Sequence, residues 1–148
     1  MEVKVKKVNS LATVPKYATK GSAGFDLASV AKLSIKPGET RVVPTGLSVA
    51  VPEGFEMQIR PRSGMSLNTK LRVANSPGTI DADYRGEVGI ILHNTGSDSV
   101  DINVGDRIAQ GVVCPVEQVT FKVVEDLDAT ERASGGFGST GATVNDEE

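Results

Sequence analysis

Two arginines and a serine stand close together in the segment RPRSGMS, residues 60–66. Where a strand leads into a short helix, such a segment can present backbone N–H groups, a hydroxyl and a guanidinium to one anion, and the helix N-terminus adds positive potential. The segment therefore indicates an anion site around Arg62 and Ser63. Taken by itself it is more typical of a surface turn with solvated arginines, so both interpretations stay open.

Two carboxylates follow a turn in the segment NSPGTIDADYRGE, residues 75–87. Asn, Pro and Gly are turn residues with runs typical of strands on both sides, so the sequence predicts a hairpin. The backbone of a hairpin can read the edge of a base, and an Asp at its root can orient or deprotonate a water. An Asp-x-Asp pair such as Asp81 and Asp83 is, however, common in polar turns that have no function of this kind. The spacing does not match a calcium loop, because Arg85 stands where that motif needs Asp or Asn, so a dedicated calcium site is not expected.

Two further charged segments are expected to form ion pairs. Asp26 stands among small apolar residues in GSAGFDLAS, residues 21–29, where a carboxylate needs a partner. We expect this partner to be an arginine or a metal-bound water. In GDRIAQ, residues 105–110, Asp106 or Arg107 is expected to form an internal ion pair that stiffens a turn.

One cation and one aromatic ring, Arg132 and Phe137, lie among glycines and hydroxyls in the last segment, RASGGFGSTGATVNDEE. Residues 125–148 offer little apolar area to offset the entropy cost of ordering them, so we predict a flexible C-terminal arm. No G-x-x-x-x-G-K-[ST] segment occurs, so these glycines are not a Walker-type phosphate loop. Phosphate binding in this chain is therefore expected to rely on arginine side chains instead of a P-loop lysine.

Short runs with period-two alternation, separated by turn residues, must position these side chains. GFEMQIR places Phe55, Met57 and Ile59 on one face, and EVGIILHN (87–94) and VTFKVV (119–124) alternate similarly. We expect about seven to ten strands, because the runs are rich in Val and Ile and no long helical period occurs. The predicted class is all-β, with two packed sheets over residues 1–124. One or two helical turns are expected around residues 63–70, with a Ser as the N-cap.

Length, charge and residue counts exclude several classes of protein. A chain of 148 residues fits one domain. The single Cys114 allows no intramolecular disulfide, and no apolar run of about 18 residues occurs, so a cytoplasmic protein without a membrane anchor is expected. A net charge of −3 and 4% aromatic residues argue against a nucleic-acid partner. The single His93 is expected to be structural, because metal sites and catalytic triads built on imidazole need partner residues that this chain does not place beside it.

In their order along the chain, five segments resemble the five motifs of the trimeric deoxyuridine triphosphatase (dUTPase) family. They are AGFDLAS, RPRSGMS, NSPGTIDADYRG, GDRIAQ and RASGGFGSTG, and they span residues 23–141. The resemblance implies an all-β, jelly-roll-like homotrimer with active sites shared among subunits. It also implies hydrolysis of dUTP to dUMP and pyrophosphate with Mg²⁺, which supplies dUMP and keeps uracil out of DNA.

The resemblance further implies residue roles. Asp81 matches the aspartate that activates the water attacking the α-phosphorus, and Tyr84 the ring that packs under the deoxyribose and leaves no room for a 2′-hydroxyl. Asp26 matches an aspartate that helps to organise the water shell of Mg²⁺, which the phosphates mainly hold. The arm matches a lid, with Arg132 at the γ-phosphate and Phe137 over the uracil.

The other implied substrate contacts divide by the part of the nucleotide they meet. The phosphate contacts are Arg62, Ser63, Gly64, Gln110, Gly138 and Ser139. The uracil contacts, largely through the main chain, are Asn75, Gly78, Thr79, Ile80 and Gly89, with Gly89 on the returning strand of the hairpin.

Two rival functions and one departure accompany this resemblance. The dCTP deaminases share the fold and the handling of the triphosphate, but TIDADYRG and the intact GGFGSTG favour a dUTPase. A non-catalytic jelly roll that binds a protein or signals nucleotide levels would not need Asp81, Tyr84, Arg132 and Phe137 together. Ala133 stands where Gly usually follows the arm's arginine, which matters if the position needs a positive φ.

Overall fold

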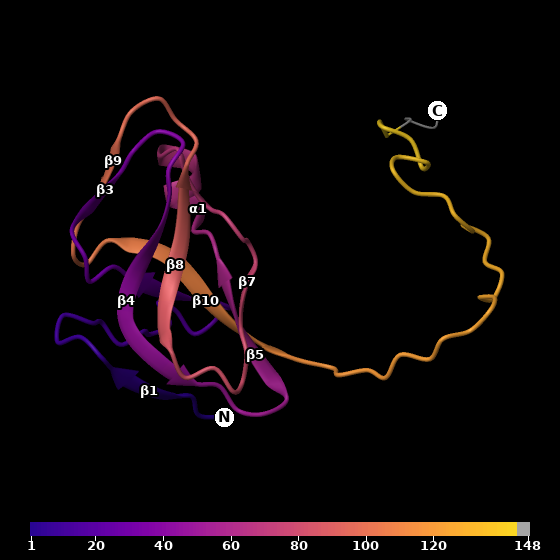
Figure 1. Ribbon diagram of the computed structural model, residues 1–148, viewed down its shortest axis with the longest axis horizontal. Helices are drawn as coiled ribbons and strands as arrows, with labels where there is room; N and C mark the ends of the chain where they lie inside the picture. Colours follow the sequence, from indigo (N-terminus) through magenta and orange to yellow (C-terminus); the bar gives the residue numbers. More distant parts are fainter. Residues whose placement is uncertain (145–148) are drawn as a thin grey trace. The chain divides into compact units, whose positions relative to one another are not determined.

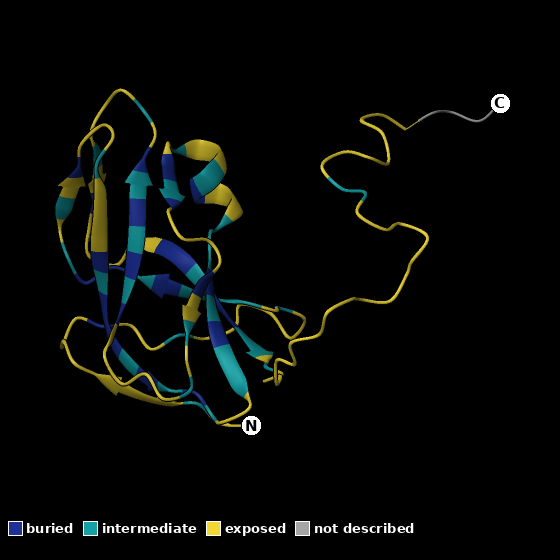
Figure 2. Cartoon of the chain, turned by 45° about the vertical axis from the view of Figure 1, so that its right-hand side comes forward, coloured by how far each residue is buried: buried dark blue, intermediate teal, exposed yellow. Residues whose placement is uncertain are grey.

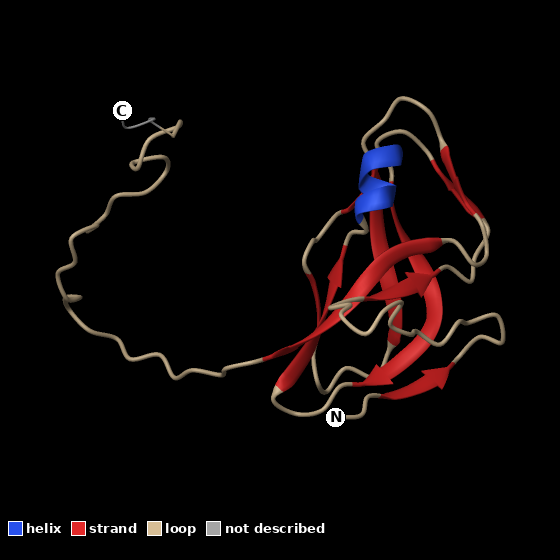
Figure 3. Cartoon of the chain, turned by 180° about the vertical axis from the view of Figure 1, so that it is seen from behind, coloured by secondary structure: helices blue, strands red, loops and turns tan. Residues whose placement is uncertain are grey.

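The computed structural model describes residues 1–144 (Figure 1). The chain divides into two compact units, Met1–Glu117 and the residues from Gln118 onward. The described residues form ten strands and one short helix, all within the first unit. Figure 3 shows the helix at one end of the strands. The predicted all-β class is confirmed.

Two four-stranded sheets and one two-stranded ribbon make up the first unit, and every strand pairing is antiparallel. The first sheet has the order β1 (Lys4–Lys7), β4 (Thr40–Ala50), β8 (Glu87–Asn94), β6 (Leu71–Val73). The second has the order β2 (Phe25–Ala28), β10 (Arg107–Pro115), β5 (Phe55–Arg60), β7 (Gly78–Ile80). The ribbon pairs β3 (Leu33–Ile35) with β9 (Val100–Ile102), and helix α1 (Ser63–Asn68) follows β5.

Alternation in the sequence becomes alternation of burial in the two best-patterned strands. In β5, Met57 and Ile59 are buried while Phe55 at its start is half-buried. In β8, every second residue from Val88 to Asn94 is buried. These two predicted strands are confirmed, because one face of each packs on the core and the other does not.

The core lies between the two four-stranded sheets, as the buried segments in Figure 2 indicate. The first sheet contributes Val43, Leu47, Val49, Leu71, Val88, Ile90 and Leu92, and the second contributes Leu27, Met57, Ile59, Ile108 and Ala109. One continuous apolar layer thus supports the strands that carry the candidate site.

The strand expected at residues 119–124 is wrong. This segment has no strand conformation, and Phe121 and Val123 are almost fully exposed. Alternation gives a segment the propensity for a strand, but the backbone N–H and C=O groups also need a neighbour to pair with. Within residues 1–144 no strand pairs with this segment. In the same part of the chain, no helix is long and apolar enough to cross a membrane.

Replacing Leu92 tests the core. Its side chain is 0% exposed, so Leu92→Ala is expected to lower the free energy of unfolding by about 2–5 kcal/mol. Leu67→Ala makes the same chemical change at a residue that is 84% exposed, and its effect should stay within about 0.5 kcal/mol. Urea unfolding at one protein concentration measures both. Equal losses for the two variants would contradict this description of the core.

Candidate active site

Asp26, on β2, lies between two arginines. Nε of Arg62 donates a hydrogen bond of 2.8 Å to Oδ1 of Asp26, and Nη1 of Arg107 lies 3.5 Å from Oδ2. Nη1 of Arg62 also donates a longer bond of 3.4 Å to the carbonyl of Arg107. The expectation that Asp26 meets an arginine is confirmed. Because two cations share one carboxylate, this cluster keeps an excess of positive charge that can attract an anion.

Strand β10 explains how these residues meet. Gln110 lies opposite Asp26 on β2 and opposite Arg60 on β5. Its side-chain amide donates a hydrogen bond of 2.9 Å to the carbonyl of Pro61, which ties the turn before Arg62 to the sheet. One strand therefore holds the carboxylate on one side and the arginine-bearing turn on the other.

Helix α1 begins directly after Arg62. Arg62 is the N-cap and makes no side-chain capping bond, so the expected serine cap is wrong and Ser63 is the first helical residue. A hydroxyl cap is not essential here, because the Arg62 side chain is held by Asp26 and the helix is anchored through the buried Met65. Ser63 and Gly64 are exposed. The first N–H groups of any helix lack intrahelical partners, so this turn can donate to an external acceptor.

The turn at residues 74–77 joins strands of two different sheets. β6 before it pairs with β8, whereas β7 after it pairs with β5. The predicted hairpin is therefore wrong, because turn residues mark a reversal but do not choose the strand that each flank pairs with. Gly89 is likewise not on a returning strand of such a hairpin: it lies on β8, opposite Pro44 of β4.

Strand β7 carries three of the predicted uracil contacts at a sheet edge. Gly78 is buried, and a Cβ on it would lie 3.1 Å from Cβ of Ile59 and 3.3 Å from Nδ2 of Asn75. Thr79 is exposed and Ile80 is half-buried. Among residues 1–144, β7 pairs only with β5, so its other edge presents backbone donors and acceptors outward. An edge of this kind can read the hydrogen-bonding pattern of a planar base.

Tyr84 is held by the backbone around it. Its N–H donates to the carbonyl of Asp81 at 3.1 Å, and its hydroxyl donates to the carbonyl of Glu87 at 2.9 Å. Glu87 in turn accepts a hydrogen bond of 2.8 Å from the N–H of Gly46 on β4. Tyr84 as a whole is 42% exposed, so part of it remains available to a ligand.

The carboxylates of Asp81 and Asp83 are exposed. Within the described residues neither forms an ion pair or a side-chain hydrogen bond. Asp26 differs in this respect, since its carboxylate is shared by two arginines. An unengaged carboxylate can accept a proton from water, which is the chemistry expected of a general base.

The predicted arm residues form a series of tight turns within the second unit. Nε of Arg132 donates to the carbonyl of Gly135 at 2.8 Å, and the N–H of Ser139 donates to the carbonyl of Gly136 at 3.0 Å. Ala133 has a φ of 49° and Phe137 a φ of 50°, and the Phe137 side chain is fully exposed. Ala133 thus adopts the left-handed conformation, which costs a non-glycine residue about 1–2 kcal/mol.

Arg107 is the member of the cluster that the sequence did not assign to the site. It stands three positions before Gln110, and in a regular strand such an odd spacing points side chains to opposite faces. The register shifts between Arg107 and Ala109, and a bulge of this kind lets Arg107 reach the same carboxylate. The predicted internal ion pair is confirmed for Arg107, whereas the Asp106 carboxylate accepts from the N–H of Asn103.

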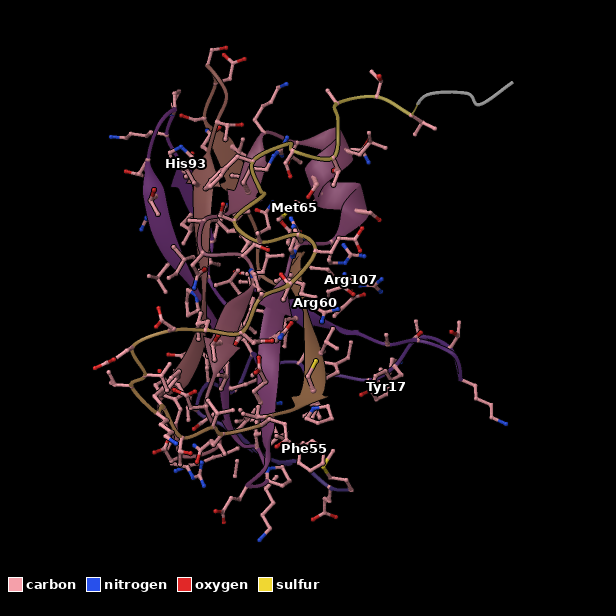
Figure 4. The ribbon with its side chains drawn as sticks, turned by 90° about the vertical axis from the view of Figure 1, so that its right-hand side faces the viewer. Tyr17, Phe55, Arg60, Met65, His93 and Arg107 are labelled. Atoms are coloured by element: carbon pink, nitrogen blue, oxygen red, sulfur yellow. The ribbon has the colours of Figure 1, made fainter. Side chains whose placement is uncertain are left out.

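Other parts of the structure lie outside this constellation. A cavity of about 300 Å³ is lined by Val5, Tyr17, Phe25, Leu27, Met57 and other apolar residues, and no predicted site residue lines it. Nδ1 of His93 and the hydroxyl of Thr40 form a hydrogen bond of 2.9 Å. Figure 4 shows His93 well separated from Arg60 and Arg107.

Comparisons with known proteins agree on one family. The sequence model of the dUTPase family matches residues 11–141. The deoxyuridine 5′-triphosphate nucleotidohydrolase of Caulobacter vibrioides is 54% identical over 132 residues, which is 86% of this chain and 85% of that protein. A structure of the dUTPase of Staphylococcus bacteriophage 80alpha with dUPNHPP has a TM-score of 0.90 and 30% identity, covering 95% of this chain and 99% of that one. A mutant dUTPase from phage phi11 of S. aureus, described with a structural Mg(II) ion, has a TM-score of 0.80 and 28% identity, covering 85% and 98%.

Removing the Asp26 carboxylate tests the charge cluster. Asp26→Ala should lower the free energy of unfolding by about 1 kcal/mol, because Arg62 loses a short, half-buried, charge-assisted hydrogen bond. Glu39→Ala is the control, since Glu39 faces Arg41 at 4.0 Å on the surface and accepts only one long, exposed hydrogen bond of 3.3 Å, from the N–H of Lys36, so its loss should cost little. Urea unfolding gives both values, and exchange of the Arg62 Nε–H with solvent, measured by NMR, should accelerate only in Asp26→Ala. Unchanged exchange in that variant would show that Asp26 does not hold Arg62.

Proposed function

The chain belongs to the dUTPase family, and from this premise we propose that it hydrolyses dUTP to dUMP and pyrophosphate. The observation that carries the proposal is the match of the family model to residues 11–141, a stretch that contains all five motif segments. The phage 80alpha relative, whose structure was solved with dUPNHPP, supports a ligand of the deoxyuridine triphosphate type for this fold.

We propose that Arg62 binds the triphosphate together with the first turn of α1. A triphosphate carries about four negative charges, so a chain of net charge −3 must bind it with cations gathered at one place. Arg62 is oriented by Asp26, and Arg107 adds a second cation beside it. Gln110 uses one amide N–H for Pro61, which leaves the other for a phosphate oxygen. The remaining phosphate contacts of the proposal are Ser63, Gly64, Arg132, Gly138 and Ser139.

Mg²⁺ is the cofactor of the proposed reaction. Within residues 1–144 no three His, Cys, Asp or Glu side chains are grouped as metal ligands. Mg²⁺ usually takes one or two carboxylates and keeps waters and phosphate oxygens as its other ligands, so such a group is not required. Asp26 fits a role through water, because a carboxylate has about four acceptor sites and two arginines engage only part of them. Bound Mg²⁺ would neutralise charge on the phosphate oxygens.

Asp81 is the general base of the proposal. Its exposed carboxylate forms no ion pair within the described residues, so it is able to orient a water and take its proton as that water attacks the α-phosphorus. The bond between the α-phosphorus and the bridging oxygen then breaks, and pyrophosphate leaves. No histidine takes part in this step.

The edge of β7 is the proposed site of uracil recognition. The contacts are Asn75, Gly78, Thr79 and Ile80, with Gly89 retained from the family resemblance. Outward backbone groups favour uracil over cytosine, because cytosine would leave donors and acceptors mismatched in a desolvated pocket. Tyr84 packs under the deoxyribose, where a 2′-hydroxyl would not fit. This supports discrimination against UTP.

We further propose that residues 125–148 act as a lid in a cytoplasmic homotrimer whose active sites are shared between subunits. The family resemblance supports the trimer, and the exposure of Ser63, Asp81 and Tyr84 fits a site that a second subunit completes. In a closed lid, Arg132 meets the γ-phosphate and Phe137 covers the uracil. Ordering such an arm costs entropy, so substrate contacts have to drive the closure.

Substrate specificity and the role of Asp81 can be measured together. Pyrophosphate release should be fast with dUTP and far slower with dCTP, dTTP and UTP. Asp81→Asn keeps the shape of the side chain but loses its basicity, so kcat with dUTP should fall by about 10²–10⁴-fold. Asp83→Asn, two residues away, should retain near wild-type kcat. Release of ammonia from dCTP, or equal turnover of UTP, would overturn the assignment.

The arm can be tested by truncation. Removing residues 132–148 should leave a folded trimer, since the core of the first unit is untouched. At the same time kcat/KM for dUTP should fall by about 10²-fold or more, because the proposed contacts of Arg132, Phe137, Gly138 and Ser139 are lost. Removing only residues 142–148, which follow the last motif, is the matched control and should keep most of the turnover. Sedimentation measures the trimer and pyrophosphate release the turnover. Full activity in the longer truncation would mean that the arm is not the lid.

A further inference from the structure

Gly86 lies against the ring of Tyr84. A Cβ on Gly86 would stand 2.6 Å from Cζ and 3.0 Å from Cε2 of Tyr84, and it would collide with the Tyr84 hydroxyl. All three of its nearest neighbours belong to this one side chain. Contacts below 3.0 Å are far inside van der Waals distance, so the ring occupies the space that any side chain at position 86 would need.

Neither the backbone nor the core explains a glycine at this position. The φ of Gly86 lies outside the left-handed region that favours glycine, unlike that of Gly46 or Gly54. Gly86 is also exposed, so no buried neighbour limits its size. The ring of Tyr84 is therefore the feature that excludes a larger residue.

Tyr84 cannot move away from a new side chain and keep its bonds. Its hydroxyl donates to the carbonyl of Glu87 at 2.9 Å, one residue beyond Gly86. The chain on both sides is held as well: Nη1 of Arg85 donates to the carbonyl of Ala82 at 2.7 Å, and Glu87 is bound to the N–H of Gly46. Displacing the ring would break the hydroxyl bond while the backbone stays in place.

We propose, on the basis of the proposed function, that Gly86 is a positioning residue for discrimination between deoxyribose and ribose. The Tyr84 ring packs directly on the backbone of Gly86, and its hydroxyl is fixed by the hydrogen bond to the Glu87 carbonyl. A ring seated in this way has one position, so it can exclude a 2′-hydroxyl by contact. A side chain at position 86 would displace the ring from the backbone, and the ring would then no longer be held in a single position.

The position of the ring can be observed without any assay of activity. The chain has no Trp and two Tyr, so in a Tyr17→Phe background the Tyr84 ring is the only tyrosine fluorophore. Tyr17 packs edge-on against Phe25 and Phe preserves that contact. Adding Gly86→Ala should increase acrylamide quenching of Tyr84. Adding Gly21→Ala, where a Cβ would meet nothing within 4 Å, should leave it unchanged. Unchanged quenching in Gly86→Ala would overturn the proposal.

Kinetics test the consequence for the substrate. In Gly86→Ala, the ratio of kcat/KM for dUTP to kcat/KM for UTP should fall by about tenfold or more, whereas Gly21→Ala should keep the wild-type ratio. If Gly86 acts through the ring, Gly86→Ala should have no further effect on this ratio in a Tyr84→Ala background. The proposal would be overturned if Gly86→Ala lowered this ratio as much in the Tyr84→Ala background as in the wild type, or if the single variant Gly86→Ala left the ratio unchanged.

Two other outcomes are also decisive. If Gly86→Ala does not fold, the Tyr84→Ala, Gly86→Ala double variant separates the causes: recovery of folding shows that the ring is the obstacle, and continued misfolding overturns the proposal. If wild type does not hydrolyse dUTP, the proposed function fails, while the quenching experiment still decides whether Gly86 seats the ring.

Discussion

Strand β10 pairs along both of its edges, and this double pairing sets the geometry around Asp26. β2 on one side carries the carboxylate, and β5 on the other leads into the turn that carries Arg62. Gln110 sits opposite residues of both strands and binds the turn directly. If either pairing shifted by one residue, every side chain of the shifted strand would change face, and the ion pair would be lost. The charged cluster therefore depends on backbone pairing more than on its own electrostatics.

Local patterns predicted the strands whose burial depends on one face. In β5 and β8 the alternation of the sequence runs along consecutive positions, and the burial of both strands follows this alternation. The errors arose where a partner has to be chosen from elsewhere in the chain. Residues 119–124 alternate equally well but pair with no strand among the described residues, and the turn before Gly78 links two sheets. Partner choice is a non-local property, so a single-strand pattern cannot contain it.

The candidate site divides in the same way. Asp26 needed a cation because of its apolar neighbours in sequence, and it has one. The second cation, Arg107, depends on a bulge that no spacing rule reveals. The proposed role of Gly86 depends on the close approach of the Tyr84 ring to its backbone, which the residues YRGE do not reveal. Ala133 lies between these cases: the sequence identified the position, and only the structure supplies its φ of 49°.

The turns between Thr130 and Gly141 have a kinetic consequence. Each is closed by hydrogen bonds between residues three apart, such as those from Gly135 to Arg132 and from Gly141 to Gly138. Contacts of such short span re-form within about 100 ns, whereas enzymes commonly turn over at about 1–10³ events per second. At such rates the local shape around Arg132 and Phe137 would re-equilibrate many thousands of times within one turnover of the proposed reaction. If this segment acts as the proposed lid, its closing time would be set by diffusion to the substrate and departure from it, because its internal turns re-form much faster.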